Sequence, residues 1–277
     1  MKTYPVILSI AGSDSGGCAG IQADLKTMSA LGVFGASVIT TVTAQNTLGV
    51  QLIHHLPASV LRAQAEAVLS DFPVSAVKIG MIGQKEAVGV IAEVLLKYKP
   101  FYVVIDPVMV AGSGDSLTDV ETIELVKNKL FPLATVVTPN LHEVSALLGQ
   151  KIDTLSQMES AAKELAAWGC KSVLIKGGHL QDNLMTDVLW IAKEQKTYHF
   201  SSPRITTNNL HGTGCSLSSA IASLLVLGKT IHQAVESAKE YITAAIDAGK
   251  DISVGHGNGP VNHFFNPQKL KTVEFKE

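Results

Sequence analysis

Cys215 directly follows the glycines of a segment that reads HGTGCSLSSAI and ends at Ile221. The apolar residues that follow Gly212, Thr213 and Gly214 have a spacing typical of a helix. Backbone N–H groups at a helix start bind anions, with help from the helix dipole, and glycine lets an oxyanion approach closely. The stretch therefore predicts an anion site, although a helix start capped by Thr or Ser, with nothing bound, fits the same letters.

Cys215 is open to several kinds of chemistry, as a nucleophile, a metal ligand, a proton acceptor or an ordinary buried thiol. As a nucleophile it would use His211 as its base, but such pairs are usually built from distant segments. A cysteine hydrolase is one rival hypothesis. A non-catalytic small-molecule sensor is another, although a sensor has no need of Lys, Asp and Glu gathered near an anion site.

Several familiar catalytic motifs do not occur in the sequence. No segment supplies the P-loop pattern, and Leu217 stands where a dinucleotide fingerprint needs its third glycine. The letters GCSLS end in serine where an esterase elbow needs glycine, and His142-Glu143 lacks the second histidine of a zinc-protease helix. No Cys-x-x-Cys pair exists, which disfavours a structural zinc site.

A second glycine-rich segment reads AGSDSGGCAGIQADLK and ends at Lys26. It follows an apolar run and enters a predicted helix, so its glycines could wrap closely around a small ligand. Asp24 falls one to two turns into that helix, where an acid is either a ligand contact or an ordinary solvated residue. Cys18 is interpreted as a small packing residue.

The elements that must position these residues are short apolar runs, which read PVILSIAG, ASVITTVTA, AVKIGM, YVVIDPVM, ATVVTPN and SVLIKGG. Runs that are apolar nearly throughout indicate strands covered on both faces. Helical stripes lie between several of them, at 61–69, 88–95 and 158–165. This order predicts an α/β fold, a three-layer αβα sandwich around a mainly parallel central sheet. TDVLWIA and KTYHFS predict an edge hairpin, and two helices are expected at about 214–227 and 231–248.

The strand ends carry polar or special residues, namely Ser13-Asp14, Gln45-Asn46, Gly80-Met81, Asp106-Pro107, Pro139-Asn140 and Lys176-Gly177-Gly178. In an open parallel sheet, ligands bind outside the carboxyl ends of the strands. Turn formation explains Pro107 and Gly178, but neither Gln45 nor Lys176 is a turn former. We therefore expect the six strand ends to face one crevice, with the hairpins near the first strands covering it.

The bulk composition narrows the class of protein. The chain has 277 residues, 46% hydrophobic and 17% charged, with a net charge of −2. That length suits a single domain over 1–277, and the charge balance favours neither nucleic acid nor a membrane surface as partner. Three scattered cysteines argue against a disulfide framework, and the N-terminal apolar run is too short for a secretory signal. A soluble cytoplasmic protein is expected.

Eight motifs occur in the order found in one family of kinases, and they read AGSDSGGCAGIQADLKT, TAQNTLGV, KIGM, IDPVM, VTPNLHE, IKGGH, HGTGCSLSSAIAS and VGHGNGPVNHF. The chain resembles the ribokinase superfamily, and specifically the hydroxymethylpyrimidine and phosphohydroxymethylpyrimidine kinases of thiamine biosynthesis, over roughly 6–265. The resemblance implies a ribokinase-like fold, an ATP- and Mg²⁺-dependent kinase and a homodimer. Pyridoxal kinases belong to the same branch, and pyridoxal or pyridoxine phosphorylation is the alternative function.

The resemblance also implies residue roles. Gly212 to Cys215 would form the anion hole, with Cys215 replacing the Asp that most sugar kinases of the superfamily use as base. Asn140 and Glu143 match an Asn-x-x-Glu motif that organises magnesium and phosphates, Glu143 through water. The remaining implied roles are the same metal for Asp106, ATP phosphates for Lys176, and the pyrimidine pocket for Asp24, Gln45, Met81 and backbone around Gly12, Ala19 and Val108.

Elementary chemistry agrees with these roles. Phosphoryl transfer needs positioning and charge neutralisation, which an anion hole, a lysine and Mg²⁺ held by acids supply. The Gln45 amide can pair with an aminopyrimidine edge, whereas the methionine of related pyridoxal kinases cannot. We further expect the helix start to lower the pKa of Cys215, making it a proton acceptor in a first phosphorylation. A thiol that can also stay neutral would not repel a monophosphate in a second.

Overall fold

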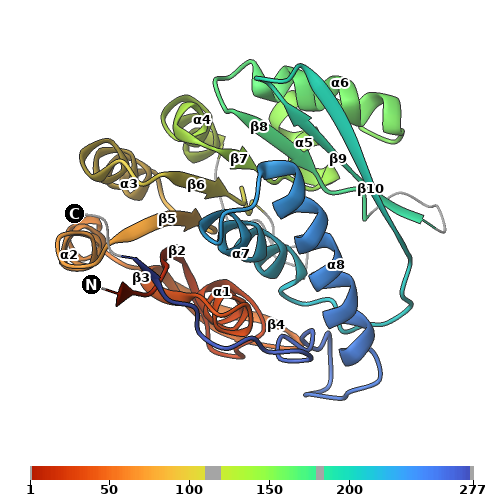
Figure 1. The fold of residues 1–277 in the computed structure, drawn as a ribbon, viewed down its shortest axis with the longest axis horizontal. Helices are drawn as coiled ribbons and strands as arrows, with labels where there is room; N and C mark the ends of the chain where they lie inside the picture. The colour runs from red at the N-terminus through yellow and green to blue at the C-terminus, as the bar shows by residue number, and fades with distance from the viewer. Residues whose placement is uncertain (1, 110–119, 179–183, 275–277) are drawn as a thin grey trace.

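A computed structural model describes residues 2–109, 120–178 and 184–274. Within these residues, nine strands form one sheet in the order β10-β9-β8-β7-β6-β5-β2-β3-β4 (Figure 1). The strands are β2 (Val6–Asp14), β3 (Phe34–Asn46), β4 (Gly49–His55), β5 (Val74–Ile79), β6 (Tyr102–Ile105), β7 (Val136–Val137), β8 (Ser172–Ile175), β9 (Leu184–Ile191) and β10 (Lys196–Pro203).

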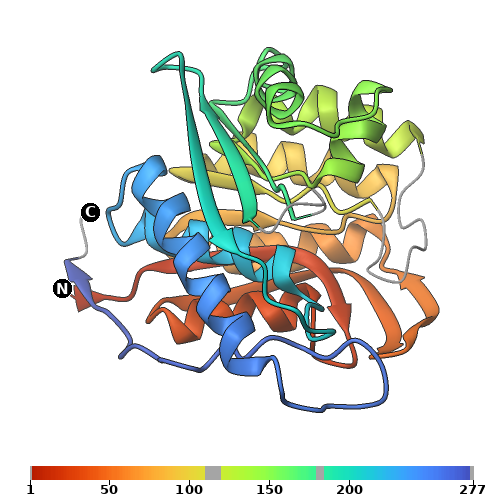
Figure 2. The ribbon, with the colours of Figure 1, turned by 90° about the vertical axis from the view of Figure 1, so that its right-hand side faces the viewer.

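Six neighbouring strands, from β3 to β8 in the sheet order, run parallel, and antiparallel strands occupy both edges. β4 pairs antiparallel with β3 on one side, while β9 and β10 form the predicted hairpin on the other. The prediction of a mainly parallel sheet with an edge hairpin is confirmed. A separate two-stranded ladder joins β1 (Lys2–Thr3) to β11 (Val273–Glu274), so the two segments lie side by side at the left of Figure 2.

Helices cover both faces of the sheet, as Figure 1 shows. They are α1 (Gly20–Ala30), α2 (Ala58–Leu69), α3 (Lys85–Tyr98), α4 (Val120–Lys129), α5 (Leu141–Leu148), α6 (Leu155–Ala166), α7 (Thr213–Val226) and α8 (Ile231–Gly249), with a 3₁₀ turn at Phe131–Leu133. Helices α2 to α6 pack on one face, and α1, α7 and α8 pack on the other. The three-layer sandwich predicted from the alternating pattern is therefore confirmed.

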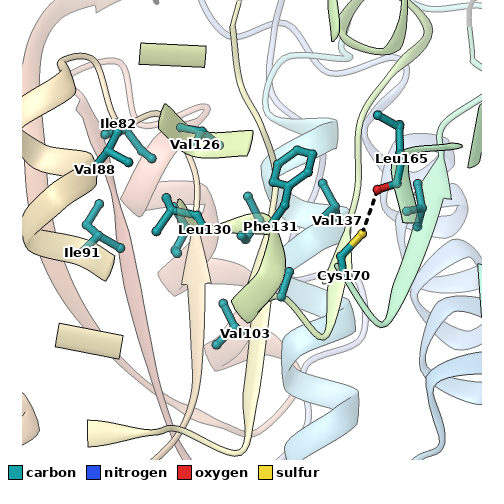
Figure 3. Close-up of a cluster of buried hydrophobic side chains, with 14 of the residues drawn as sticks. Ile82, Val88, Ile91, Val103, Val126, Leu130, Phe131, Val137, Leu165 and Cys170 are labelled. Atoms are coloured by element: carbon teal, nitrogen blue, oxygen red, sulfur yellow. Dashed lines mark hydrogen bonds between the residues drawn. The ribbon is translucent and has the colours of Figure 1, made fainter. Parts of the chain in front are cut away.

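The core between the sheet and the α2–α6 layer is built from the predicted apolar stripes. In Figure 3, Val88 and Ile91 of α3 point toward Val103 and Leu130, and Leu165 of α6 lies beside Cys170. The Cys170 thiol donates to the Leu165 carbonyl oxygen at 3.5 Å, and burial raises the pKa of this cysteine to about 12. Cys170 is thus an inert packing residue, and all three cysteines are free thiols.

Helix α7 begins at Thr213 and ends before Gly228, close to the predicted bounds. It is buried along most of its length because it packs against α8, α1 and the sheet. Among the described residues, no helix combines the length and apolar character needed to cross a membrane.

Candidate active site

The carboxyl ends of the parallel strands open into one cavity of about 780 Å³, within the size range of ligand pockets. Each of the six predicted strand ends contributes to its wall, and the loop before α7 closes it. The lining residues predicted from the sequence are Gly12, Ala19, Gln45, Met81, Asp106, Val108, Asn140, Glu143, Lys176, Gly212, Thr213, Gly214 and Cys215. The β3–β4 hairpin supplies Gln45 and Val50 to the wall, which agrees with its expected covering position.

The start of α7 leaves backbone amides available to an anion, apart from the Thr213 N–H, which donates to the Leu210 carbonyl oxygen at 3.2 Å. Its N-cap is Gly212, which has no capping side chain, so a Thr or Ser cap does not satisfy the remaining donors. Gly212 has φ of 83°, and a Cβ there would lie 1.9 Å from the Cys18 carbonyl oxygen. Only glycine therefore allows this loop to pack against the segment before α1. The two helix starts consequently meet beside Cys215.

A charged pair lies beside this loop. Lys176, after β8, donates to Asp106 Oδ1 at 2.7 Å, and Asp106 is only 1% exposed. Thr138 also donates to Asp106 Oδ1, at 3.2 Å. A Cβ on Gly214 would lie 3.3 Å from Lys176 Nζ and 3.4 Å from Asp106 Oδ2, so the glycine leaves this approach clear. The pair places a lysine and a carboxylate next to the anion-binding amides.

Asn140 and Glu143 are joined by a reciprocal cap at the start of α5. Asn140 Oδ1 accepts from the Glu143 backbone N–H at 2.9 Å, and Glu143 Oε2 accepts from the Asn140 N–H at 2.7 Å. Burial raises the pKa of Glu143 to about 7, and Asp106 adds to the increase while Lys176 opposes it. A carboxylate held above its usual pKa favours a nearby positive charge.

The thiol of Cys215 differs from expectation. Its pKa is raised to about 11, because burial outweighs the favourable effects of Lys78 and of a hydrogen bond from the Gly20 N–H. The prediction that the helix start lowers this pKa is therefore wrong. The physical reason is desolvation, which disfavours the thiolate more than the nearby positive groups favour it. Cys215 carries its proton at neutral pH.

Asp24 does not line the cavity, and the expectation that it contacts a ligand is wrong. Its side chain is fully buried, and Lys78 Nζ donates to its two oxygens at 2.9 and 3.0 Å. Ser9 and Ser219 donate to the same carboxylate at 2.6 and 2.7 Å. Ser219 lies one turn beyond Cys215 on α7, so this buried pair sits behind the thiol rather than in the cavity.

Sequence reasoning missed the role of Lys78, although a signal was present. Lys78 is the one charged residue of a mostly apolar strand, and a buried lysine there must find an acid. Two cavity residues were also missed as partners of the Gln45 amide, namely Thr43 and His211. No local pattern indicates the contact with His211, because it lies 166 positions from Gln45. His179, in the quoted motif IKGGH, lies outside the described residues.

The donor atoms limit what metal the site could hold. Among the described residues, no group of three or more His, Cys, Asp or Glu side chains is arranged around a common point. Asp106 and Glu143 supply carboxylate oxygens to the same cavity. Two carboxylates fit Mg²⁺, which keeps several waters and takes further ligands from phosphates, better than they fit a transition metal.

Comparison with known proteins adds family information to this geometry. Residues 14–262 match the model of the family described as phosphomethylpyrimidine kinase. The hydroxymethylpyrimidine/phosphomethylpyrimidine kinase of Rhizobium meliloti is 47% identical over 94% of this chain and 97% of its own length. The thiamine biosynthesis bifunctional protein of Geobacter sulfurreducens is 46% identical over 96% of this chain, which spans 53% of that protein.

The fold is also that of a solved kinase. The structure of Staphylococcus aureus pyridoxal kinase in complex with AMP-PCP and pyridoxal matches with a TM-score of 0.87 and 31% identity. The match covers 99% of this chain and all of that one. The ribokinase-like architecture predicted from the sequence is confirmed by this match.

Proposed function

The chain belongs to the phosphomethylpyrimidine kinase family, and we propose that it phosphorylates 4-amino-5-hydroxymethyl-2-methylpyrimidine with ATP and then phosphorylates the monophosphate. The observation that carries this proposal is the single cavity in which the amides before Cys215, the cation of Lys176 and the amide of Gln45 meet. The first two suit phosphate groups, and the third suits an aminopyrimidine.

The start of α7 supplies the anion hole of the proposed reaction. Amides between Gly212 and Cys215, apart from the Thr213 N–H that donates to the Leu210 carbonyl oxygen, would donate to oxygens of the transferring phosphoryl group, and Lys176 would neutralise phosphate charge. Because these donors are fixed by helix geometry and by the close approach of Gly212 to Cys18, they need little rearrangement as charge moves. Preorganisation of this kind lowers the barrier to phosphoryl transfer.

Asp106 and Glu143 would hold Mg²⁺ with the nucleotide phosphates, Glu143 through water, and the ion would supply charge neutralisation at those phosphates. The oxygen-only donor set fits this ion. The raised pKa of Glu143 also fits, since a cation beside the buried carboxylate would offset the cost of its burial. Asn140 would keep this carboxylate oriented through the reciprocal cap.

Another part of the same cavity would receive the pyrimidine. Met81 and Val108 offer contact to a small ring, and Gly12 lets the ring approach the backbone of β2. A Cβ on Gly12 would lie 2.5 Å from Met81 Cε, so the two residues are matched in size. Ala19, just before α1, completes the wall beside Gln45.

Cys215 would serve both phosphorylations as a neutral thiol. In a loose transition state the hydroxymethyl group keeps its proton until the new O–P bond is forming, and the proton would then pass to an oxygen of the transferred phosphoryl group. For the monophosphate, whose acceptor oxygen is already anionic, a carboxylate at this position would be repulsive. A thiol that holds its proton avoids that repulsion.

The proposed oligomeric state, domain organisation and cellular location rest on other observations. We expect a homodimer, because β4 is an edge strand whose Leu52 and Ile53 are exposed. We expect a single kinase domain over 1–277, because one sheet extends from β2 to β10. We expect a cytoplasmic location, because the reaction consumes ATP and the cysteines are free thiols.

An ADP-release assay with three acceptors in parallel tests the function. The pyrimidine alcohol and its monophosphate should both release ADP, each with a higher kcat/KM than pyridoxal. Faster turnover of pyridoxal would instead favour the vitamin B6 alternative. No release with any acceptor, together with ester hydrolysis that is lost in Cys215→Ala, would favour the cysteine hydrolase.

A further inference from the structure

The side-chain amide of Gln45 lies between two groups that decide which of its ends is oxygen. In one orientation of the amide, Oε1 lies 3.0 Å from Thr43 Oγ1. In the same orientation, Nε2 lies 3.1 Å from His211 Nε2. A half-turn of the amide exchanges the two atoms without moving their neighbours, so the hydrogen-bond partners must decide between them.

Thr43 determines which atom of the Gln45 amide faces its hydroxyl. Its hydroxyl has a single hydrogen, and it also lies 3.0 Å from the Ser13 carbonyl oxygen. A carbonyl oxygen can only accept, so that hydrogen belongs to Ser13, and a lone pair of Thr43 faces Gln45. The amide atom opposite must therefore be the donor, Nε2.

His211 determines which atom of the Gln45 amide faces its imidazole ring. Its Nε2 lies 3.5 Å from Asp14 Oδ2, and Asp14 accepts backbone N–H groups from Gly16, Cys18 and Ala19. Burial raises the pKa of Asp14, but His211 and the N–H groups of Ala19 and Gly16 outweigh it, and the pKa lies below its usual value. A carboxylate only accepts, so a hydrogen on His211 Nε2 avoids a repulsion between lone pairs. The amide atom facing that hydrogen must be the oxygen, Oε1.

The two sides thus require the same orientation, with Nε2 toward Thr43 and Oε1 toward His211. The backbone of Gln45 is fixed as well, because its N–H donates to Ser15 Oγ and its carbonyl oxygen accepts from that hydroxyl, both at 2.8 Å. One N–H and one lone pair of the amide then remain for a ligand in the cavity. They form a donor–acceptor edge of defined polarity.

This polarity distinguishes two pyrimidines, a point that rests on the proposed function. A 4-aminopyrimidine presents a ring-nitrogen acceptor beside an amino donor, whereas its 4-oxo analogue presents a ring N–H donor beside a carbonyl acceptor. Because the 5-hydroxymethyl group must point to the start of α7, the ring cannot turn over to suit the amide. We propose that Thr43 and His211 are specificity-determining residues that hold the Gln45 amide in the orientation that selects the amino over the oxo pyrimidine.

The test is the ratio of kcat/KM for the 4-amino and 4-oxo forms of 5-hydroxymethyl-2-methylpyrimidine. Thr43→Val keeps the side-chain shape and removes the acceptor for Nε2, so the ratio should fall about tenfold, the value of one hydrogen bond. Thr186→Val is the matched control, because Thr186 pairs with Ser201 in the β9–β10 hairpin, outside the cavity. The control should keep the parent ratio. An unchanged ratio in Thr43→Val would overturn the proposal.

A second measurement uses the parent protein alone. Nitrogen-15 NMR of labelled histidine should show His211 protonated at Nε2, and an unprotonated Nε2 would overturn the proposal even if Thr43→Val fails to fold. The same measurement separates the two claims. If the parent phosphorylates neither pyrimidine, the proposed function fails, while the NMR result still decides the orientation of Gln45.

Discussion

Replacing Lys78 with methionine should lower the free energy of unfolding by about 3–5 kcal/mol, because the change leaves the Asp24 carboxylate buried without its counter-charge. Both side chains are fully buried, and the lysine donates to both carboxylate oxygens. Methionine has a similar length and is apolar, so the lost charge, rather than a cavity, dominates the effect. A loss of this size is a large share of the 5–15 kcal/mol typical of folded proteins.

A double-mutant cycle isolates the interaction. Asp24→Asn alone leaves the Lys78 charge unpaired and should cost a similar amount, while the double variant buries no charge at this site. The double variant should therefore cost no more than either single change, so its loss should be at least about 3 kcal/mol smaller than the sum of the two single losses. Urea unfolding measures all four proteins, and an unchanged slope would show that each variant exposes the same amount of surface on unfolding as the parent. Lys151→Met, which breaks an exposed pair with Asp153, is the control and should leave the midpoint unchanged.

The same variants test where Asp24 lies. Because the cavity wall does not include Asp24, Asp24→Asn should change stability while the KM for the pyrimidine stays close to that of the parent. Additive losses in the cycle would refute the ion pair. A tenfold rise in KM with unchanged stability would refute the placement of Asp24 and restore its role as a ligand contact.

Three other changes have defined outcomes. Cys215→Asp should lower kcat/KM for the monophosphate more than for the alcohol, and equal relative rates in ADP-release assays would refute the argument for a neutral thiol. Gln45→Met should weaken pyrimidine binding by about 1–3 kcal/mol in calorimetry, the cost of unpaired buried polar atoms, and unchanged affinity would move the pyrimidine pocket elsewhere. Without Mg²⁺, the folded-state pKa of Glu143 lies near 7, above its unfolded value, so its contribution to stability is present at acidic pH and is lost as pH rises toward 7. Relative to Glu143→Gln, the parent should therefore lose stability over that window, and parallel pH curves would contradict the raised pKa.

The sequence predicts the strands and the cavity edge well, because both depend on local patterns. Apolar runs ending in residues such as Gln45 and Lys176 give the sheet and its carboxyl end, and the glycines before Cys215 give the helix start. These features depend on hydrophobicity and backbone conformation, which neighbouring residues largely determine.

The sequence alone could not show which polar side chains are buried. The sequence does not show whether α1 turns Asp24 toward solvent or toward α7. Only the packing of these helices makes it a partner of Lys78. The pKa of Cys215 fails for the same reason. Its position at a helix start is a local feature, but the desolvation that raises its pKa comes from segments far apart in the chain.

The charges around the cavity explain why one site could accept both an alcohol and its phosphate ester. Lys78 is neutralised by Asp24 and Lys176 by Asp106, and Cys215 holds its proton. Attraction for the phosphate of the acceptor at the loop therefore comes largely from backbone amides, whose partial charges neither titrate nor move, while Lys176 would serve the ATP phosphates. Such a site attracts phosphate without the excess positive charge that would favour a dianion strongly over a neutral alcohol. A carboxylate at position 215 would upset that balance first for the monophosphate, which is why Cys215→Asp should separate the two steps.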